Sequence, residues 1–159
     1  MASLKKSIRG QVAQMERRFP DLALTIESNT LIWTGNLRPF QKIYSVRIYW
    51  GTESYERPYV VLETPALAPR EGEGFEDIPH LLFNQDNPAK SGMCLFDPEQ
   101  KQWDPRYDYI AKTTIPWAAK WLANYEYWHL TGEWLGEGIL PATVRELSGD
   151  SNDEIGEAA

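Results

Sequence analysis

The sequence predicts one α+β domain. Its periodic segments come in the order helix, several strands, a long irregular stretch and a second helix. Only short turns separate the strand segments, which favours antiparallel neighbours over parallel strands joined by helical crossovers. With 159 residues, of which 42% are hydrophobic, the chain is long enough to form a single domain with its own core.

The first segment, from Leu4 to Phe19, is predicted to be an amphipathic helix that Ser3 caps and Pro20 ends. Its apolar residues recur at steps of three and four and form one stripe: Leu4, Ile8, Val12, Met15 and Phe19. The other faces carry five basic residues: Lys5, Lys6, Arg9, Arg17 and Arg18. A solvated helix face is the ordinary interpretation of such charges, and a docking surface for an acidic partner is the alternative.

Strand character follows in three stretches: Leu22 to Trp33, Ile43 to Trp50 and Tyr59 to Glu63. Two short glycine-containing segments, Thr34–Asn36 and residues 51–54, are typical of hairpin turns. Together these signals predict a four-stranded antiparallel meander.

The remainder of the chain divides into three parts. From Pro65 to about Lys101 the periodicity fails, and a stretch of this length inside a compact domain is usually functional. A second helix is predicted from Pro116 to Leu130, with Gly132 as its stop signal. Residues 141–159 are acidic, so we expect a domain over residues 1–140 and a flexible tail beyond it.

Composition excludes several classes of function. A formal charge of −7 argues against nucleic acid as the main ligand, because phosphate binding needs a basic face. No apolar run is long enough to cross a membrane and no signal peptide is visible, so we expect a cytoplasmic protein. One cysteine and two separated histidines do not form a zinc motif, and Gly72 and Gly74 do not form a phosphate loop. We therefore expect neither a metal nor a cofactor.

The one cysteine, Cys94, lies in the irregular stretch, in the sequence SGMCLFDPEQ. A buried and inert cysteine is the ordinary interpretation. The loop setting and the nearby Gly92, which we expect to adopt an unusual backbone conformation, favour a solitary nucleophile. A thiol can carry an acyl group as a thioester, which reacts readily with amines and needs little help from acid–base residues.

The order of these segments, with their motifs, resembles a ubiquitin-conjugating enzyme domain over about residues 1–140. The segment Gly92-Met93-Cys94-Leu95 with Trp103-Asp104-Pro105 resembles the active-site stretch, and Pro58 to Pro65 resembles the proline-flanked strand before it. The resemblance implies a UBC-like fold with an N-terminal helix, an antiparallel four-stranded meander, an active-site loop and C-terminal helices. It also implies that Cys94 is the thioester-forming residue.

A downstream pattern is more specific. It resembles the ubiquitin-conjugating-like proteins that bacterial CBASS antiphage operons encode beside a cGAS-like nucleotidyltransferase. The residues that carry this likeness are Pro116-Trp117, Trp121-Leu122, Tyr125-Glu126, Trp128, Thr131-Gly132, Trp134, Gly136 and Gly138. No activating-enzyme module is visible in 159 residues, so the chain resembles the short, stand-alone version.

That resemblance implies a specific reaction and partner. The C-terminal glycine of the nucleotidyltransferase would become a thioester on Cys94 and would then pass to an amine of a protein or small molecule. The transfer would prime antiphage signalling. Neither nucleic acid nor a membrane is expected as a partner.

The sequence departs from the family pattern before the cysteine. Ubiquitin-conjugating enzymes carry a His-Pro-Asn motif there, whereas His80 is followed by Leu81-Leu82-Phe83-Asn84 with Asn87 beyond. Asn84 or Asn87 would either donate a hydrogen bond to the developing oxyanion or brace the loop. For His80 we expect a structural role, with its ring nitrogens bonded to the loop backbone.

Other aromatic and histidine residues are interpreted as structural. His129 is expected at the core or its boundary, and five tryptophans are expected to pack behind the cysteine loop: Trp103, Trp117, Trp121, Trp128 and Trp134. Two other functions stay open at this stage. One is a catalytically inactive UBC-like binding module, and the other is a cysteine hydrolase that uses Cys94 with His80 as its base.

Overall fold

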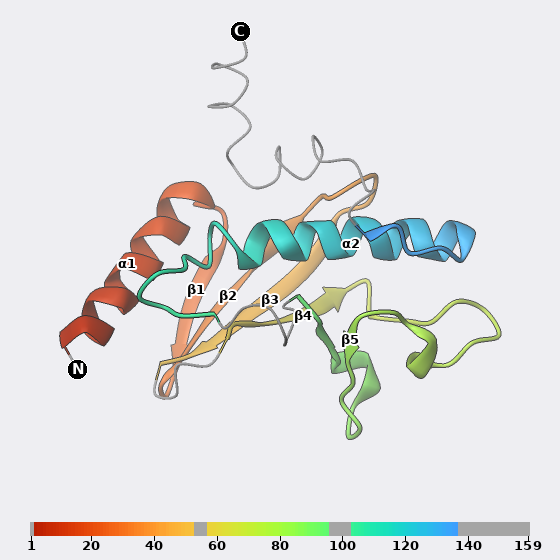
Figure 1. Cartoon of the computed structure of the whole chain (residues 1–159), viewed down its shortest axis with the longest axis horizontal. Coiled ribbons are helices and arrows are strands. Elements are labelled where there is room, and N and C mark those ends of the chain that lie inside the picture. The colour runs from red at the N-terminus through yellow and green to blue at the C-terminus, as the bar shows by residue number, and fades with distance from the viewer. Residues whose placement is uncertain (1, 53–56, 96–102, 137–159) are drawn as a thin grey trace, which may run out of the picture.

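The computed structural model describes residues 2–52, 57–95 and 103–136, with side chains from Ile8 onward. This part of the chain forms one antiparallel sheet with two α-helices, so the predicted α+β class is confirmed (Figure 1). Helix α2 crosses one face of the sheet, and α1 lies beside it near β1 and β2.

The sheet has six strands in the order β1-β2-β3-β4-β6-β5, and all neighbours are antiparallel. Its first four strands form the predicted meander, which is confirmed. The two-residue strands β5 and β6 were not predicted, because so short a ladder leaves no periodicity in the sequence. The strands are β1 (Ala23–Glu27), β2 (Thr30–Leu37), β3 (Tyr44–Gly51), β4 (Tyr59–Thr64), β5 (Leu81–Leu82) and β6 (Gly92–Met93).

The turn predicted at Thr34–Asn36 is wrong. These residues continue β2 and pair with β3, while the chain reverses earlier, at Ser28 and Asn29. Ser28 has the positive φ of 54° that a tight turn requires, although it is not glycine. Gly35 leaves room for Leu22, because a Cβ there would meet the end of the Leu22 side chain and displace it. The second predicted turn, residues 51–54, begins where β3 ends, but residues 53 and 54 lie outside the described part.

Both predicted helices are confirmed, with adjusted ends. Helix α1 spans Ala2–Arg18, so Ser3 lies inside the helix and does not cap it. Helix α2 spans Thr114–Thr131 and begins two residues earlier than predicted. It ends at Gly132, which has a left-handed φ of 84° and donates its N–H to the Trp128 carbonyl, as the stop signal predicts.

The core lies between the helices and one face of the sheet. Alternate residues of β2, β3 and β4 point inward, and the register places them opposite one another, for example Trp33 opposite Ile48 and Ile48 opposite Val60. The central buried side chains are Met15, Trp33, Val46, Ile48, Trp50, Val60, Leu62, Ile115, Ala118 and Leu122. A single hydrophobic cluster therefore joins both helices to the meander.

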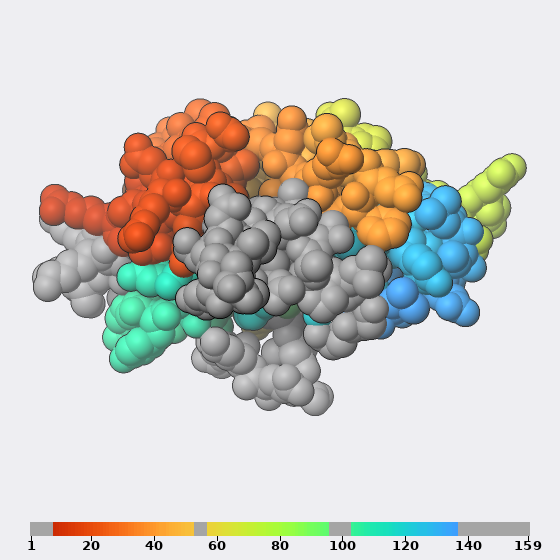
Figure 2. Space-filling model, turned by 90° about the horizontal axis from the view of Figure 1, so that it is seen from above, coloured from red at the N-terminus to blue at the C-terminus, as the bar shows by residue number. Residues whose placement is uncertain are grey.

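The two helices end at opposite sides of the molecule. In Figure 2, α1 lies at one end of the long axis and the last turns of α2 lie at the other.

The predicted tail, residues 141–159, and any helix after residue 136 fall outside the described residues. Neither α1 nor α2, the helices of the described part, has the combination of length and apolarity that a membrane span requires.

One buried polar side chain fastens α1 to the segment that leads into α2. Gln11 has no exposed surface, and its Nε2 donates to the carbonyls of Pro105 (3.2 Å) and Asp108 (2.6 Å). Its Oε1 accepts a hydrogen bond from the Ile110 N–H at 2.8 Å. The Gln11 side chain thus satisfies three backbone groups that would otherwise be buried without a partner.

We predict that Gln11→Ala lowers the free energy of unfolding by about 3 kcal/mol, because it strands these backbone groups in the interior. The matched control is Gln14→Ala on the same helix, whose amide oxygen accepts a long 3.4 Å bond from Arg18. It should change stability by no more than about 0.5 kcal/mol. Urea denaturation measures both variants, and equal losses would contradict the special position of Gln11.

Candidate functional site

Cys94 lies directly after β6 and is half-buried. Strand β6 is held on both sides, because Gly92 pairs with Val61 of β4 and with Leu82 of β5. The Cys94 N–H donates to the His80 carbonyl at 2.9 Å, which extends the β5–β6 pairing by one residue. The backbone that carries the thiol is therefore fixed by the sheet, and the residue is not sealed in the core.

The expected role of Gly92 is wrong in its physical reason. This glycine is extended within β6 and does not adopt an unusual backbone conformation. Instead it lies against the ring of Tyr59, and any Cβ at this position would overlap that ring. The glycine before the cysteine is thus required by close packing between β4 and β6.

The backbone of His80 lies beside that of Cys94. It is a non-glycine residue with a positive φ of 52°, and its carbonyl oxygen accepts two hydrogen bonds. One comes from the Cys94 N–H at 2.9 Å, and the other from Nε1 of Trp121 on α2 at 2.8 Å. The His80 ring lies against Trp134, with 5.4 Å between ring centroids. We expected the ring nitrogens of His80 to hydrogen-bond the loop backbone. In the structure the carbonyl of His80 makes the hydrogen bonds, and its ring packs on Trp134.

Two of the five tryptophans predicted behind the cysteine loop, Trp121 and Trp134, contact His80 and so support this backbone, whereas Trp103 packs on Trp50 of β3. Trp103, Trp121 and Trp128 are each 4% exposed, while Trp117 and Trp134 are half-buried. The Trp121 ring contacts Trp134 at 5.2 Å between centroids and stacks on Tyr125 at 5.3 Å. Since the Trp121 indole also binds the His80 carbonyl, α2 supports the cysteine segment directly.

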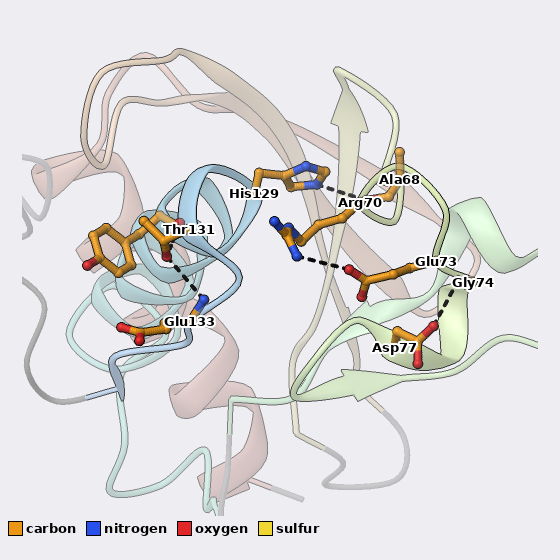
Figure 3. A network of polar contacts seen from close by, with 9 residues as sticks. Ala68, Arg70, Glu73, Gly74, Asp77, His129, Thr131 and Glu133 are labelled. Atoms are coloured by element: carbon orange, nitrogen blue, oxygen red, sulfur yellow. Dashed lines mark hydrogen bonds and ion pairs between the residues drawn. The ribbon is translucent and has the colours of Figure 1, made fainter.

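The end of α2 holds a second loop in the same way. The Tyr125 hydroxyl bonds both the N–H and the carbonyl of Ala68 at 3.0 Å, and burial raises the pKa of Tyr125. His129 is half-buried at the core boundary, as expected, and its Nε2 lies 2.9 Å from the same carbonyl. Figure 3 shows His129 reaching from the helix to this loop, where Arg70 pairs with Glu73. The loop that follows β4 is therefore anchored by side chains of α2.

Asn84 and Asn87 lie at the other end of the β5–β6 hairpin. Asn84 donates its N–H to the Ser91 hydroxyl, three residues from Cys94 along the chain, or about 10 Å of extended strand. Its Oδ1 accepts hydrogen bonds from the N–H groups of Asp86 and Asn87, both at 3.1 Å. Asn87 is exposed and precedes a short 3-10 helix, Pro88–Lys90. Of the three residues predicted beside the thiol, the structure brings His80 to it.

A buried carboxylate to which the sequence analysis assigned no role, Glu126, lies farther along α2. Glu126 is 3% exposed and accepts hydrogen bonds from the N–H groups of Gln41 and Lys42 and from the Tyr44 hydroxyl, at 3.0–3.1 Å. Burial, together with this carboxylate, raises the pKa of Tyr44 far above its ordinary value. The only sequence signal was an acidic residue within an otherwise apolar helix face. Its role is to hold the chain between β2 and β3.

The site offers the chemistry of a thiol on a fixed backbone. A half-buried cysteine reaches solvent while its main chain is held by two strands and an indole. Within residues 2–52, 57–95 and 103–136, no three His, Cys, Asp or Glu side chains gather in a way that would hold a metal ion.

We predict that Asn84→Ala lowers the free energy of unfolding by about 1 kcal/mol, because two N–H groups lose the acceptor that closes their turn. Asn84→Asp keeps an oxygen at that position and should stay close to the parent. Asn87→Ala is the control, since the contact through which Asn87 joins the turn is its backbone N–H. Urea denaturation tests all three, and a loss in the aspartate variant equal to that of alanine would contradict this role.

Comparison with known proteins identifies the family. A search of curated proteins gave no match. The family model described as "Type II CBASS E2 protein" matches residues 11–141, which is most of the chain and includes Cys94, the strands and α2. This family indicates a role in a CBASS antiphage system together with other CBASS components. The chain therefore belongs to the Type II CBASS E2 protein family.

Proposed function

We propose that this protein is an acyl transferase of the ubiquitin-conjugating type, with Cys94 as its nucleophile. The observation that carries the proposal is the position of Cys94: half-buried, at the end of a strand fixed on both sides, within the Gly-x-Cys-Leu segment. Membership of the E2 family supports the same reaction class. The acyl group belongs to the C-terminal glycine of a cognate cGAS-like nucleotidyltransferase, and its transfer primes antiphage signalling.

The proposed reaction has two balanced steps. In the first, the Cys94 thiolate attacks the carbonyl carbon of an activated acyl donor, so a C–S bond forms and the bond to the activating group breaks. In the second, an amine attacks the thioester, so a C–N bond forms and the C–S bond breaks. The amine loses a proton, and the thiol is regenerated. The donor must arrive activated, because a free carboxylate does not form a thioester spontaneously.

The fold is consistent with this assignment. An N-terminal helix, an antiparallel meander, a cysteine segment after it and a supporting helix follow in the order that a UBC-like fold requires. The proline-flanked strand, β4, is the neighbour of β6, so it lies beside the residues that precede the thiol. These features support a UBC-like domain as part of the proposal.

Two roles for Asn84 make different demands on its side chain. As a loop brace it needs the Oδ1 acceptor that bonds Asp86 and Asn87, whereas an oxyanion site needs its NH₂ donor. The observed acceptor bonds favour the brace. Asn84→Asp keeps the acceptor and removes the donor, so a brace role predicts retained thioester formation. An oxyanion role predicts a loss of about a hundredfold or more.

The hydrolase alternative needs the His80 imidazole beside the sulfur as a base. The His80 ring packs on Trp134, and it is the carbonyl of His80 that accepts the Cys94 N–H, a pattern that favours the transferase. An inactive binding module would not need the cysteine. Iodoacetamide labelling of Cys94 at graded pH distinguishes these alternatives, because an activated Cys–His pair reacts well below pH 7.

We predict that Cys94→Ala abolishes conjugation and leaves folding intact, since the change removes the nucleophile and little packing. Cys94→Ser should instead trap an oxyester, which is less reactive toward amines. Co-expression with the nucleotidyltransferase and the component that activates its C-terminus, followed by gels with and without reducing agent, detects the thioester as a band shift. Persistence of that band in the alanine variant would refute the mechanism.

A further prediction concerns the partner's C-terminus. Deleting its terminal glycine should eliminate the covalent adduct, because a side chain beside the reacting carbonyl restricts the approach to the sulfur. Noncovalent binding, measured by co-purification, should persist because it uses a wider surface. Mass spectrometry locates the adduct on the partner. An attachment site at an internal residue of the partner would contradict a thioester between Cys94 and the C-terminal glycine.

A further inference from the structure

The carbonyl oxygen of His80 is the point at which the cysteine segment meets α2. Two donors from distant parts of the chain reach it: the Cys94 N–H at 2.9 Å and the Trp121 indole N–H at 2.8 Å. A carbonyl oxygen has two lone pairs, so both bonds form at once. The backbone at Cys94 is thereby linked to a buried side chain of the helix through one atom.

The conformation of His80 accompanies this double contact. Its φ of 52° lies in the left-handed region, which non-glycine residues enter rarely and His, Asn and Asp enter more often than others. Such a conformation costs free energy and persists only where the surroundings hold it. Here the carbonyl bonds hold the backbone, and the contact with Trp134 holds the ring.

Trp134 completes the support from the other side. Its ring meets His80 at 5.4 Å and meets Trp121 in an edge-on contact at 5.2 Å. Trp121 therefore supports His80 twice, through its own N–H and through Trp134. Since Trp121 is 4% exposed and stacked on Tyr125, its own orientation is fixed by the core.

The geometry points to Trp121 as a positioning residue for Cys94, acting through the left-handed backbone of His80. The indole N–H fixes the His80 carbonyl, and that carbonyl fixes the main chain at the thiol. In this arrangement His80 contributes its backbone conformation and not a basic ring. The consequence for thioester formation rests on the proposed function, whereas the consequence for the Cys94 backbone does not.

The first test compares Trp121→Phe with Trp50→Phe. Both changes shorten a buried tryptophan, but Nε1 of Trp50 has no hydrogen-bond partner among the described residues, so its loss breaks no known bond. Amide hydrogen exchange of Cys94 in the isolated protein, measured by NMR, is the readout. Exchange at Ile48 in the central strand β3 corrects each variant for global stability.

We expect the Cys94 amide of Trp121→Phe to exchange about fivefold or more faster than in the parent after that correction. In Trp50→Phe it should match the parent. Equal exchange in the two variants would overturn the positioning role. This measurement needs no partner protein, so its outcome does not depend on whether the proposed transferase activity is correct.

A second pair of variants tests the role of His80. His80→Asn adopts the left-handed region readily, whereas His80→Ala does so at a cost, and neither retains an imidazole. We expect the asparagine variant to keep more Cys94 amide protection and a faster single-turnover thioester formation than the alanine variant. Equal loss of thioester formation, with amide protection unchanged in both, would instead identify the imidazole as the functional group and overturn this inference.

Activity measurements then connect the two levels. The donor is the nucleotidyltransferase with its C-terminus activated as a small-thiol thioester, so that the small thiol is the leaving group. With this donor, Trp121→Phe should lower the rate constant of thioester formation on Cys94. It should leave the concentration for half-maximal rate unchanged, since Trp121 is 4% exposed and offers almost no surface to a partner. If no variant, including the parent, forms a thioester, the proposed function fails while the exchange result still decides the positioning role. If Trp121→Phe shows faster exchange but a parental rate constant, positioning has no catalytic consequence and that part of the inference is wrong.

Discussion

Hydrogen bonds from side chains of α2 fix the backbone of three loops relative to the helix. Trp121 binds the carbonyl of His80, Tyr125 and His129 bind Ala68, and Glu126 binds the N–H groups that precede β3. The Ala68 and Gln41–Lys42 segments lie outside the strands, so their backbone polar groups need a partner from elsewhere, and the His80 carbonyl, at the end of the β5–β6 pairing, accepts a second bond. The helix supplies these partners while its apolar side chains fill the core. A single element therefore sets the positions of segments that are far apart in the sequence.

The residues that do this are mostly aromatic, which has a physical reason. Tyrosine and tryptophan bury a large apolar surface and still carry one donor that must be satisfied. In Trp121 and Tyr125 the ring packs against other rings, and the polar atom reaches a backbone group. Charged contacts are placed differently: Arg47 and Lys90 pair with Glu63 near the outer face of the sheet, where exposure weakens such pairs. The support of the thiol is thus largely insensitive to salt.

Periodicity was sufficient to predict the α+β class, the meander and both helices, because each depends on local patterns of apolar residues. The stop of α2 at Gly132 was also predictable, since a left-handed cap favours glycine. Prediction failed where a distant contact decided the outcome. Gly35 indicated a turn but serves a close approach of Leu22, and the two-residue strands β5 and β6 have no pattern to detect.

At the candidate site, too, local sequence features were predictable and contacts with distant residues were not. Its sole cysteine and the motif around it pointed to Cys94 from the sequence alone, since a nucleophile is recognised by residue type. The partners of the His80 carbonyl could not be predicted, because a backbone acceptor has no sequence signature and Trp121 lies 41 residues away. A weaker signal was present in the buried tryptophans, each of which carries a donor that needs an acceptor. Asn84 and Asn87 were plausible at the thiol until the hairpin register separated them from it.

The packing of Gly92 beneath Tyr59 has a consequence for how this site can vary among related sequences. The Tyr59 ring, and not the backbone conformation of Gly92, prevents a side chain at position 92. Which residue is allowed at position 92 therefore depends on the residue at position 59. Alanine at 92 becomes acceptable once residue 59 is small enough to vacate that volume. Positions 59 and 92 are therefore expected to covary across the family. A motif definition that treats the glycine as an independent requirement for reactivity would exclude functional members that have changed both residues.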